Sequence, residues 1–382
     1  MALSDRTDPA WQRLKFDELV AQQIALRYSR ELKAKSIAHA IAPTVTDLTD
    51  RLLASLPFAL TRAQTRVENE IAKDLAKTTP MNRLVQGDVG SGKTVIAALA
   101  AARAIDAGFQ AALMAPTEIL AEQHFAGLSR LLEPLGIRCE LLTGSLTPKQ
   151  KRERREAIAA NDVDFIIGTH ALVSDTTTFH DLGLVITDEQ HRFGVGQRAK
   201  LSAKGNDPHL LVMSATPIPR TLALLMYGDL EVSILDELPP GREAVDTFLV
   251  GESYRPRINA FIRKQVQEGH QVFVVCPAVE ENEELGMKAA TVWADTLQQT
   301  VFPDLRIALL HGQMKGAEKE AAMEAFARGE ADVMVATTVI EVGVDVPNAT
   351  LMVIEDADRF GLSQLHQLRG RVGRGKAKSY CI

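Results

Sequence analysis

The sequence predicts an α/β fold, with two tandem domains on parallel sheets after a short helical segment. The chain has 382 residues, which is more than one hydrophobic core usually serves. From about residue 84 onward, short apolar runs alternate with helical segments. This alternation is typical of parallel strands covered by helices on both faces. A Pro-Pro-Gly break within residues 236–247 separates two such series, so we expect two domains joined by a linker.

The first 57 residues are predicted to form a helical connector. Apolar residues recur among polar ones between residues 10 and 42: Leu14, Leu19, Ile24 and Leu26. The proline of Ala42-Pro43 interrupts this helical pattern. No strand pattern appears before residue 84, so this part of the chain is expected to precede the first sheet.

The first domain is predicted over residues 58–236 and the second over residues 248–382, with a linker at 237–247. Apolar runs predict six strands in the first domain, at 84–88, 111–116, 139–144, 164–169, 182–189 and 210–216. Four more are predicted in the second, at 271–277, 305–312, 332–338 and 350–356. The last residues, SYCI, begin like another strand. We therefore expect the second domain to be truncated, with an unpaired edge on its sheet.

Composition narrows the class of protein. The net charge is −6, which weighs mildly against a wholly basic nucleic-acid binder but leaves room for a local basic groove. Aromatic residues make up 5%, few for a protein that stacks single-stranded bases. The three cysteines lie far apart, which predicts a reducing, cytoplasmic location. No apolar run approaches the ~18 residues of a membrane span, so no membrane association is expected.

A phosphate-binding loop follows the first predicted strand. Residues 87–94 read Gly-Asp-Val-Gly-Ser-Gly-Lys-Thr and match the pattern G-x-x-x-x-G-K-[ST] between a strand and a helix. The whole run is predicted to cradle phosphates: Gly87, Asp88, Val89, Gly90, Ser91, Gly92, Lys93 and Thr94. Lys93 would bridge the β- and γ-phosphates, and Thr94 would ligate Mg²⁺.

Two acidic residues, Asp188 and Glu189, follow the apolar strand at 182–187. Asp188 is predicted to hold Mg²⁺ through water, and Glu189 to orient the attacking water. These features predict a P-loop nucleoside triphosphatase. A kinase, a transporter ATPase and a switch GTPase remain open at this point. A GTPase would be expected to carry an Asn-Lys-x-Asp segment that recognises guanine, and the sequence has none.

Two arginines in the second domain, Arg371 and Arg374, each follow a glycine. Phosphoryl transfer gains much from an arginine that reaches the developing charge. If these arginines act from another domain, ATP could close the two domains and hydrolysis could open them, as in a motor. Taken alone, the stretch could equally be a solvated basic turn.

The full set of motifs resembles superfamily 2 helicases, and most closely the bacterial RecG family. This resemblance implies two tandem RecA-like P-loop NTPase domains. The stretches that carry the resemblance are RLKFDELVAQQIAL (13–26), FALTRAQTRVENEI (58–71), QGDVGSGKT (86–94), APTEILAEQH (115–124), LLTGS (141–145), IGTHAL (167–172), TDEQHRFGVGQR (187–198), MSATPIPRT (213–221), LLHGQMK (309–315), ATTVIEVGVDVPNAT (336–350) and RFGLSQLHQLRGRVGRG (359–375). The transcription-repair translocase Mfd shares several of them, but the DEQH spelling at 188–191 favours RecG.

The resemblance assigns roles to further residues. Adenine recognition falls to Phe58, Arg62 and Gln64, although the polarity of Gln64 could instead cap a helix. Further nucleotide contacts fall on His191, Gly343, Asp345 and Gln367. Contacts to the DNA backbone are implied for Pro116, Thr117, Thr143, Gly144, Thr169, His170, Thr337 and Thr338, since hydroxyl and backbone N–H groups suit phosphates without reading sequence. Coupling between the nucleotide and DNA sites is implied for Gln190, His191, Ser214 and Thr216.

The resemblance implies an ATP hydrolase and DNA helicase that uses ATP and Mg²⁺ and translocates on double-stranded DNA. In the family this activity reverses replication forks and migrates Holliday junctions in DNA recombination and repair. The expected partners are branched or duplex DNA and a single-strand binding protein, and the expected state is a monomer. The family's N-terminal wedge domain and C-terminal translocation hairpin are not expected in this chain. Two alternatives remain: an Mfd-like translocase, and a nucleotide-binding module uncoupled from unwinding by truncation.

Overall fold

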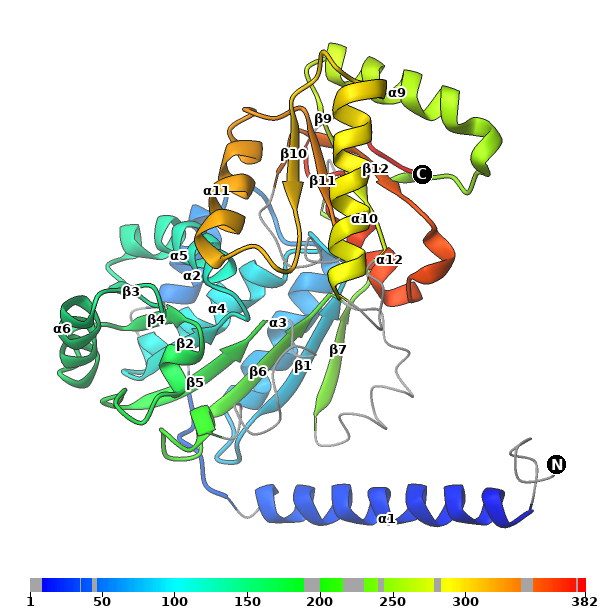
Figure 1. Ribbon diagram of the computed structural model, residues 1–382. Coiled ribbons are helices and arrows are strands. Elements are labelled where there is room, and N and C mark those ends of the chain that lie inside the picture. Colours follow the sequence, from blue (N-terminus) through cyan, green and yellow to red (C-terminus); the bar gives the residue numbers. More distant parts are fainter. Residues whose placement is uncertain are drawn as a thin grey trace. The chain divides into compact units, whose positions relative to one another are not determined.

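The structure is a computed structural model that describes residues 9–34, 36–42, 47–188, 200–215, 230–239, 244–277, 283–337, 346–375 and 377–382 (Figure 1). The chain divides into two compact units. The first unit comprises residues 1–87 and 93–235, and the second comprises residues 88–92 and 236–382. Each unit carries one parallel β-sheet, so the predicted α/β class is confirmed. Every helix in the described part of the chain is too short or too polar to span a bilayer.

The first unit is built on a seven-stranded sheet in the order β3-β4-β2-β5-β6-β1-β7, with all pairs parallel. Its strands are β1 (Asn82–Gly87), β2 (Gln110–Met114), β3 (Cys139–Leu142), β4 (Phe165–Gly168), β5 (Leu182–Thr187), β6 (His209–Ser214) and β7 (Glu231–Leu235). The α-helices in its described part are α1 (Pro9–Ala34), α2 (Leu48–Ser55), α3 (Arg62–Leu75), α4 (Lys93–Asp106), α5 (Glu118–Leu132) and α6 (Pro148–Ala159).

The six strands predicted for this unit correspond to β1 to β6. The seventh, β7, pairs with β1 at the edge of the sheet, and the sequence pattern did not predict it. Only Ser233 and Leu235 of its five residues are buried. An edge strand that buries so little lacks the continuous apolar run by which the others were recognised.

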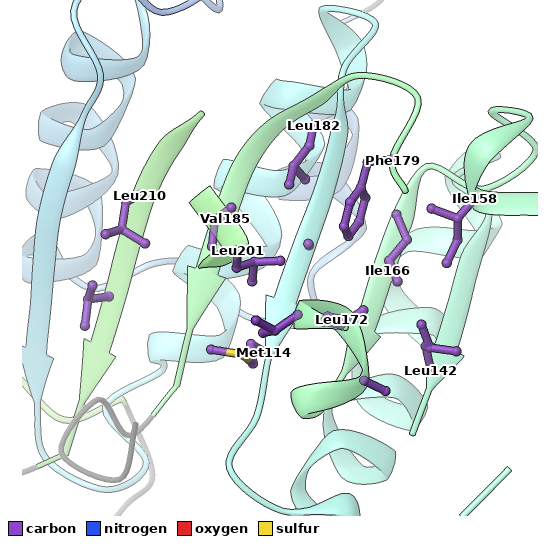
Figure 2. Close-up of a cluster of buried hydrophobic side chains, with 14 of the residues drawn as sticks. Met114, Leu142, Ile158, Ile166, Leu172, Phe179, Leu182, Val185, Leu201 and Leu210 are labelled. Carbon is purple, nitrogen blue, oxygen red and sulfur yellow. The ribbon is translucent and has the colours of Figure 1, made fainter. Parts of the chain in front are cut away.

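One face of this sheet is covered by a cluster of buried apolar side chains (Figure 2). Met114 of β2, Val185 of β5 and Leu210 of β6 contribute from the strands. Ile158 of α6 and Phe179 belong to the same cluster. The cluster packs the strands against the segments that cover them. This packing holds the carboxyl ends of the strands in place relative to one another.

The helical pattern predicted for residues 10–42 is only partly right. Helix α1 ends at Ala34, and residues 37–42 are neither helix nor strand. There the N–H of Ala38 donates to the carbonyl of Thr78, and that of Ile41 to the carbonyl of Leu75. Both side chains are buried. These bonds to the end of α3 and to the segment after it stabilise a non-helical backbone that local periodicity could not reveal.

The second unit is built on a six-stranded parallel sheet in the order β10-β11-β9-β12-β13-β8. Its strands are β8 (Asp246–Thr247), β9 (Gln271–Val275), β10 (Ile307–Leu310), β11 (Val333–Ala336), β12 (Ala349–Ile354) and β13 (Tyr380–Cys381). Its α-helices are α9 (Arg255–Gln267), α10 (Glu283–Thr296), α11 (Gly316–Ala327) and α12 (Leu362–Arg369).

The expectation that the final strand leaves an unpaired edge is wrong. Strand β13 pairs with β12 on one side and with β8 on the other. Strand β8 comes from the last residues of the segment predicted to be a linker. Because this segment supplies the outer strand, the backbone groups of β13 have partners on both sides.

Candidate nucleotide and DNA site

The phosphate loop lies between β1 and α4, as the sequence predicts. Gly90 and Gly92 have φ angles of 77° and 88°, a region that residues with a Cβ rarely adopt. The N–H of Val89 donates to the Asp88 carboxylate at 2.7 Å. The ammonium of Lys93 donates to the carbonyl of Gly87 at 2.7 Å. The loop is therefore turned back on itself, and it ends at the N-terminus of α4, which favours an anion.

Asp188 stands directly after β5, and its N–H donates to the carbonyl of Met114 on β2. Its carboxylate lies 2.7 Å from Nε2 of His124 on α5. The two side chains are only 12% and 11% exposed. In the sheet, β6 alone separates β5 from β1, so Asp188 and the phosphate loop follow strands that end at the same edge. Ligands bind at this edge in open parallel sheets.

The predicted Mg²⁺ ligands offer the chemistry that this ion requires. Thr94 contributes a hydroxyl in the first turn of α4, and Asp188 contributes a carboxylate. Mg²⁺ prefers such oxygen ligands and keeps several of its waters. The residues present therefore fit a magnesium ion beside a bound triphosphate.

Gln64 has a structural role as well as its predicted one. Its side-chain oxygen accepts from the N–H of Thr61 at 2.9 Å, and its own N–H donates to the Thr61 hydroxyl at 3.1 Å. This capping box begins α3, and it is the alternative that the sequence left open. Nearby, Phe58 is 46% exposed and Arg62 is exposed. The adenine contacts of these three residues stay a prediction.

The loops predicted to contact DNA follow three neighbouring strands, β2, β4 and β3. Thr117 caps α5, since its hydroxyl accepts from the N–H of Leu120 at 3.3 Å. Thr143 and Thr169 are buried, whereas His170 is exposed. The structure brings these loops to one edge. Thr143 and Thr169 are only 1% and 2% exposed as whole residues, so their hydroxyls cannot reach a phosphate without local opening.

Three residues in this region were missed by sequence reasoning. The Glu118 carboxylate accepts from the N–H of Ser145 at 3.0 Å. A Cβ built on Gly144 would lie 2.7 Å from that carboxylate, so a larger residue there would displace the Glu118 side chain. Lys151 of α6 donates to the carbonyl of Gly144 at 2.5 Å. These contacts fix the loop after β3, and only its fold could have revealed them.

The remaining predicted residues of the first unit lie on the same edge or outside the described residues. Pro116 precedes α5, and Ser214 is buried at the end of β6, in register with Gln86 of β1. Seven predicted positions fall outside the described residues: Glu189, Gln190, His191, Thr216, Thr338, Gly343 and Asp345.

In the second unit, Thr337 follows β11 and is buried, and its N–H donates to the carbonyl of Leu310. Gln367 is buried on α12. Arg371 and Arg374 follow this helix in a tight turn, in which Gly373 has a φ of 76°. Arg374 Nε donates to the carbonyl of Gly370 at 3.2 Å. This bond holds the Arg374 side chain against the backbone of the turn, and the roles of both arginines stay predictions.

Comparison with known proteins gives two family matches. The DEAD/DEAH box helicase model matches residues 61–225, and the helicase conserved C-terminal domain model matches residues 256–376. Relatives named ATP-dependent DNA helicase RecG include those of Synechocystis sp., 52% identical over 99% of this chain and 46% of the relative, and Pasteurella multocida, 52% identical over 100% and 55%. The chain therefore spans about half the length of these curated relatives.

Solved structures agree with these matches. A structure of RecG bound to a three-way DNA junction superposes with a TM-score of 0.83 and 44% identity, over 97% of this chain and 48% of that one. The DUF1998 helicase MrfA bound to DNA gives a TM-score of 0.65 at 18% identity, over 91% and 52%. The second likeness concerns the fold alone.

Proposed function

Because the chain belongs to the RecG family of helicases, we propose that it is an ATP-hydrolysing translocase that moves on double-stranded DNA and acts on branched DNA. Fork reversal and Holliday junction migration in recombination and repair are the corresponding processes. One observation carries the proposal: the phosphate loop and Asp188 follow strands that end at the same edge of one sheet.

ATP hydrolysis is assigned to the residues that lie at this edge of the sheet, together with Arg371 and Arg374. Lys93 binds the β- and γ-phosphates, and the loop N–H groups orient them. Thr94 and Asp188 would hold Mg²⁺, which neutralises charge on the phosphates when bound. Glu189 orients the attacking water, and Arg371 and Arg374 stabilise the charge that develops during transfer. Phosphoryl transfer needs mainly such positioning and charge stabilisation.

DNA binding is assigned to the neighbouring loops of the same edge. The loops after β2, β3 and β4 present exposed Ser145 and His170 beside the cap residue Thr117. Contacts of this kind fix a protein on the DNA backbone without reading sequence. Double-stranded and branched DNA are therefore the proposed substrates, and a single-strand binding protein is a proposed partner. We further propose a monomer that works in the cytoplasm.

The proposal is tested by measuring ATP hydrolysis without DNA, with linear duplex and with a model fork, each at several salt concentrations. DNA should raise the turnover, and salt should weaken this effect because phosphate contacts release counterions. A stronger response to the fork than to linear duplex would support action on branched DNA. Normal ATP binding without any response to DNA would contradict the translocase and favour an uncoupled nucleotide-binding module.

A further inference from the structure

We propose that His124 is a positioning residue for ATP hydrolysis: it holds the Asp188 carboxylate in place and joins it to helix α5. The inference rests on the proposed function, in which Asp188 is the acid associated with Mg²⁺. His124 lies outside the residues that the motifs assigned to catalysis. The structure alone reveals its contact, since the two residues are 64 positions apart.

The geometry of the contact fixes its chemistry. Nε2 of His124 and Oδ2 of Asp188 are 2.7 Å apart. An ionised carboxylate can only accept hydrogen bonds, so His124 donates from Nε2. The bond engages one carboxylate oxygen and thereby sets how the other is turned. Outer partners of this kind commonly orient the groups that serve a metal ion.

Because both side chains are buried, loss of this hydrogen bond is expected to be costly. The side chains of His124 and Asp188 are 11% and 12% exposed, so water can replace the lost partner only poorly. Removal of a hydrogen-bond partner from a buried charged group costs more than removal from an exposed one. His124 therefore contributes to the orientation of the Asp188 side chain.

Helix α5 extends the consequence toward the proposed DNA loops. Its first turn is capped by Thr117, a proposed DNA contact, and His124 lies two turns further along the same helix. Leu120 and Ala121, between them, are buried against the unit. A displacement of α5 by DNA would therefore reach Asp188 through one rigid element and one hydrogen bond. This gives DNA a direct mechanical route to the hydrolytic site.

Three variants test the proposal: His124→Gln keeps a side-chain N–H donor, His124→Leu keeps bulk without a donor, and His180→Leu changes an exposed histidine as the control. The first measurement is the affinity for a fluorescent, non-hydrolysable ATP analogue with and without Mg²⁺. The second is the turnover of ATP with and without linear duplex DNA, resolved into kcat and KM. The wild-type protein must show affinity that depends on Mg²⁺ and turnover that responds to DNA; if it does not, the proposed function fails and not this inference.

In His124→Leu, the gain in affinity from Mg²⁺ should fall by about 10- to 100-fold, the range known for outer partners of metal sites. Its kcat should fall, and DNA should stimulate it less, while affinity without Mg²⁺ stays unchanged. His124→Gln should retain most of both properties, and His180→Leu all of them. If the leucine variant matches the wild type, or if glutamine is as damaging as leucine, His124 serves packing and the proposal is overturned.

If His124→Leu does not fold, His124→Asn replaces it, because its amide has the chemistry of glutamine but a shorter reach. If His124→Gln retains the gain in affinity from Mg²⁺ and the response to DNA, and His124→Asn loses them, the positioning role is supported. Equal behaviour of these two variants overturns it.

Discussion

The two units of this chain repeat one hydrogen-bond scheme and differ in what they add to it. In the first unit, the Gln110 amide at the start of β2 donates to two buried carbonyls, at 2.9 and 2.8 Å. In the second, the Gln271 amide at the start of β9 does the same, at 2.5 and 2.8 Å. Both side chains join the end of a helix to the strand that follows it. The common frame is therefore reproduced in detail, although the two sequences show no obvious repeat.

The outer strands of the two sheets carry a second repeated pair. Arg138 donates from its N–H, Nε and Nη2 to the carboxylate of Asp164. Arg306 makes the same three bonds to Asp332. In both units the arginine precedes its acid by 26 residues. By this repeated pair, β3 and β4 of the first unit correspond to β10 and β11 of the second.

The loop after the outer strand is repeated as well. Lys151 donates to the carbonyl of Gly144, and Lys319 donates to that of Gly312 at 2.6 Å. In the first unit, Glu118 also binds the N–H that follows the glycine. The lysine bonds to Gly144 and Gly312 hold the loop in both units. The bond to Glu118 is an addition in the first unit. The phosphate loop follows β1 and Asp188 follows β5 in the first sheet, whereas the arginine turn follows α12 of the second unit.

The largest expected effect concerns the arginine turn, which distinguishes the second unit. Arg374→Ala should lower kcat by about 1000-fold or more, the typical loss when a transition-state arginine is removed. Its affinity for ATP should stay near that of the wild type. Steady-state kinetics with DNA and titration with a fluorescent ATP analogue measure the two quantities. Arg328→Ala, at an exposed site, is the control; persistent turnover in Arg374→Ala would show that the arginine does not serve the phosphates.

A buried ion network distinguishes the first unit. Arg83 donates to Asp74 at 2.9 and 2.7 Å, to Glu70 at 3.1 Å and to Ser233 at 2.7 Å. Burial alone would raise the pKa of Asp74, but hydrogen bonds from Lys77 and Arg83 outweigh it and lower this pKa. The network joins α3 to β1 and to the edge strand β7.

Arg83→Leu should lower the free energy of unfolding of the first unit by about 3 kcal/mol, the lower end for breaking a buried ion pair, because Asp74 loses the guanidinium but keeps its bond to Lys77. Denaturant unfolding followed by hydrogen exchange locates the loss. Arg152→Leu, on the exposed face of α6, is the control and should change stability by less than about 0.5 kcal/mol. A loss spread evenly over both units would contradict a network confined to the first.

The repeated glutamines test the shared frame directly. Gln110→Met and Gln271→Met keep most of the side-chain volume but remove the amide donor. The carbonyls of Ile158 and Phe326 keep a backbone N–H donor, so the buried carbonyls that lose their donor are those of Val163 and Ala331. Each substitution should cost about 1–3 kcal/mol, the usual cost of one unsatisfied buried group. Hydrogen exchange should assign the loss to the first unit in one variant and to the second in the other. If only one substitution is harmful, the two schemes are alike in geometry but not in energy.

The smallest effect concerns the pH dependence of the first unit. Burial lowers the pKa of His209 below its ordinary value, and this outweighs the opposing effect of its bond to the His39 carbonyl. Nδ1 of His209 accepts from the N–H of Met81 at 3.0 Å, so Nε2 donates to that carbonyl at 2.8 Å. The neutral ring thus joins β6 to the backbone on either side of α3.

The unfolded chain binds a proton at His209 more readily than the folded state does. The contribution of neutral His209 to the stability of the folded state is therefore full above the ordinary pKa of 6.5. It is lost as pH falls from there toward the lower pKa of the folded state. Unfolding midpoints of the wild type and His209→Gln between pH 5 and 8 measure this contribution. The glutamine keeps a donor and an acceptor but does not titrate, so its curve should be flatter. Parallel curves would contradict the assignment.

Much of this molecule could be predicted from the sequence because its signals are local. Six strands of the first sheet and four of the second are continuous apolar runs, and the phosphate loop is one uninterrupted motif between a strand and a helix. The carboxylate of Asp188 was found because it directly follows such a strand. Patterns of this kind depend on neighbouring residues, and the side chains of those residues are visible in the sequence.

Other features depended on pairings between distant segments. Strands β7 and β8 bury too little to show an apolar run, and they are defined by the partners beside them. Gln64 caps a helix because Thr61 is turned toward it, and His124 reaches Asp188 because α5 packs over the sheet. The sequence by itself determined the two α/β units and the phosphate loop. The tertiary structure decided which side chains hold one another in place, since such contacts arise only when separate elements pack together.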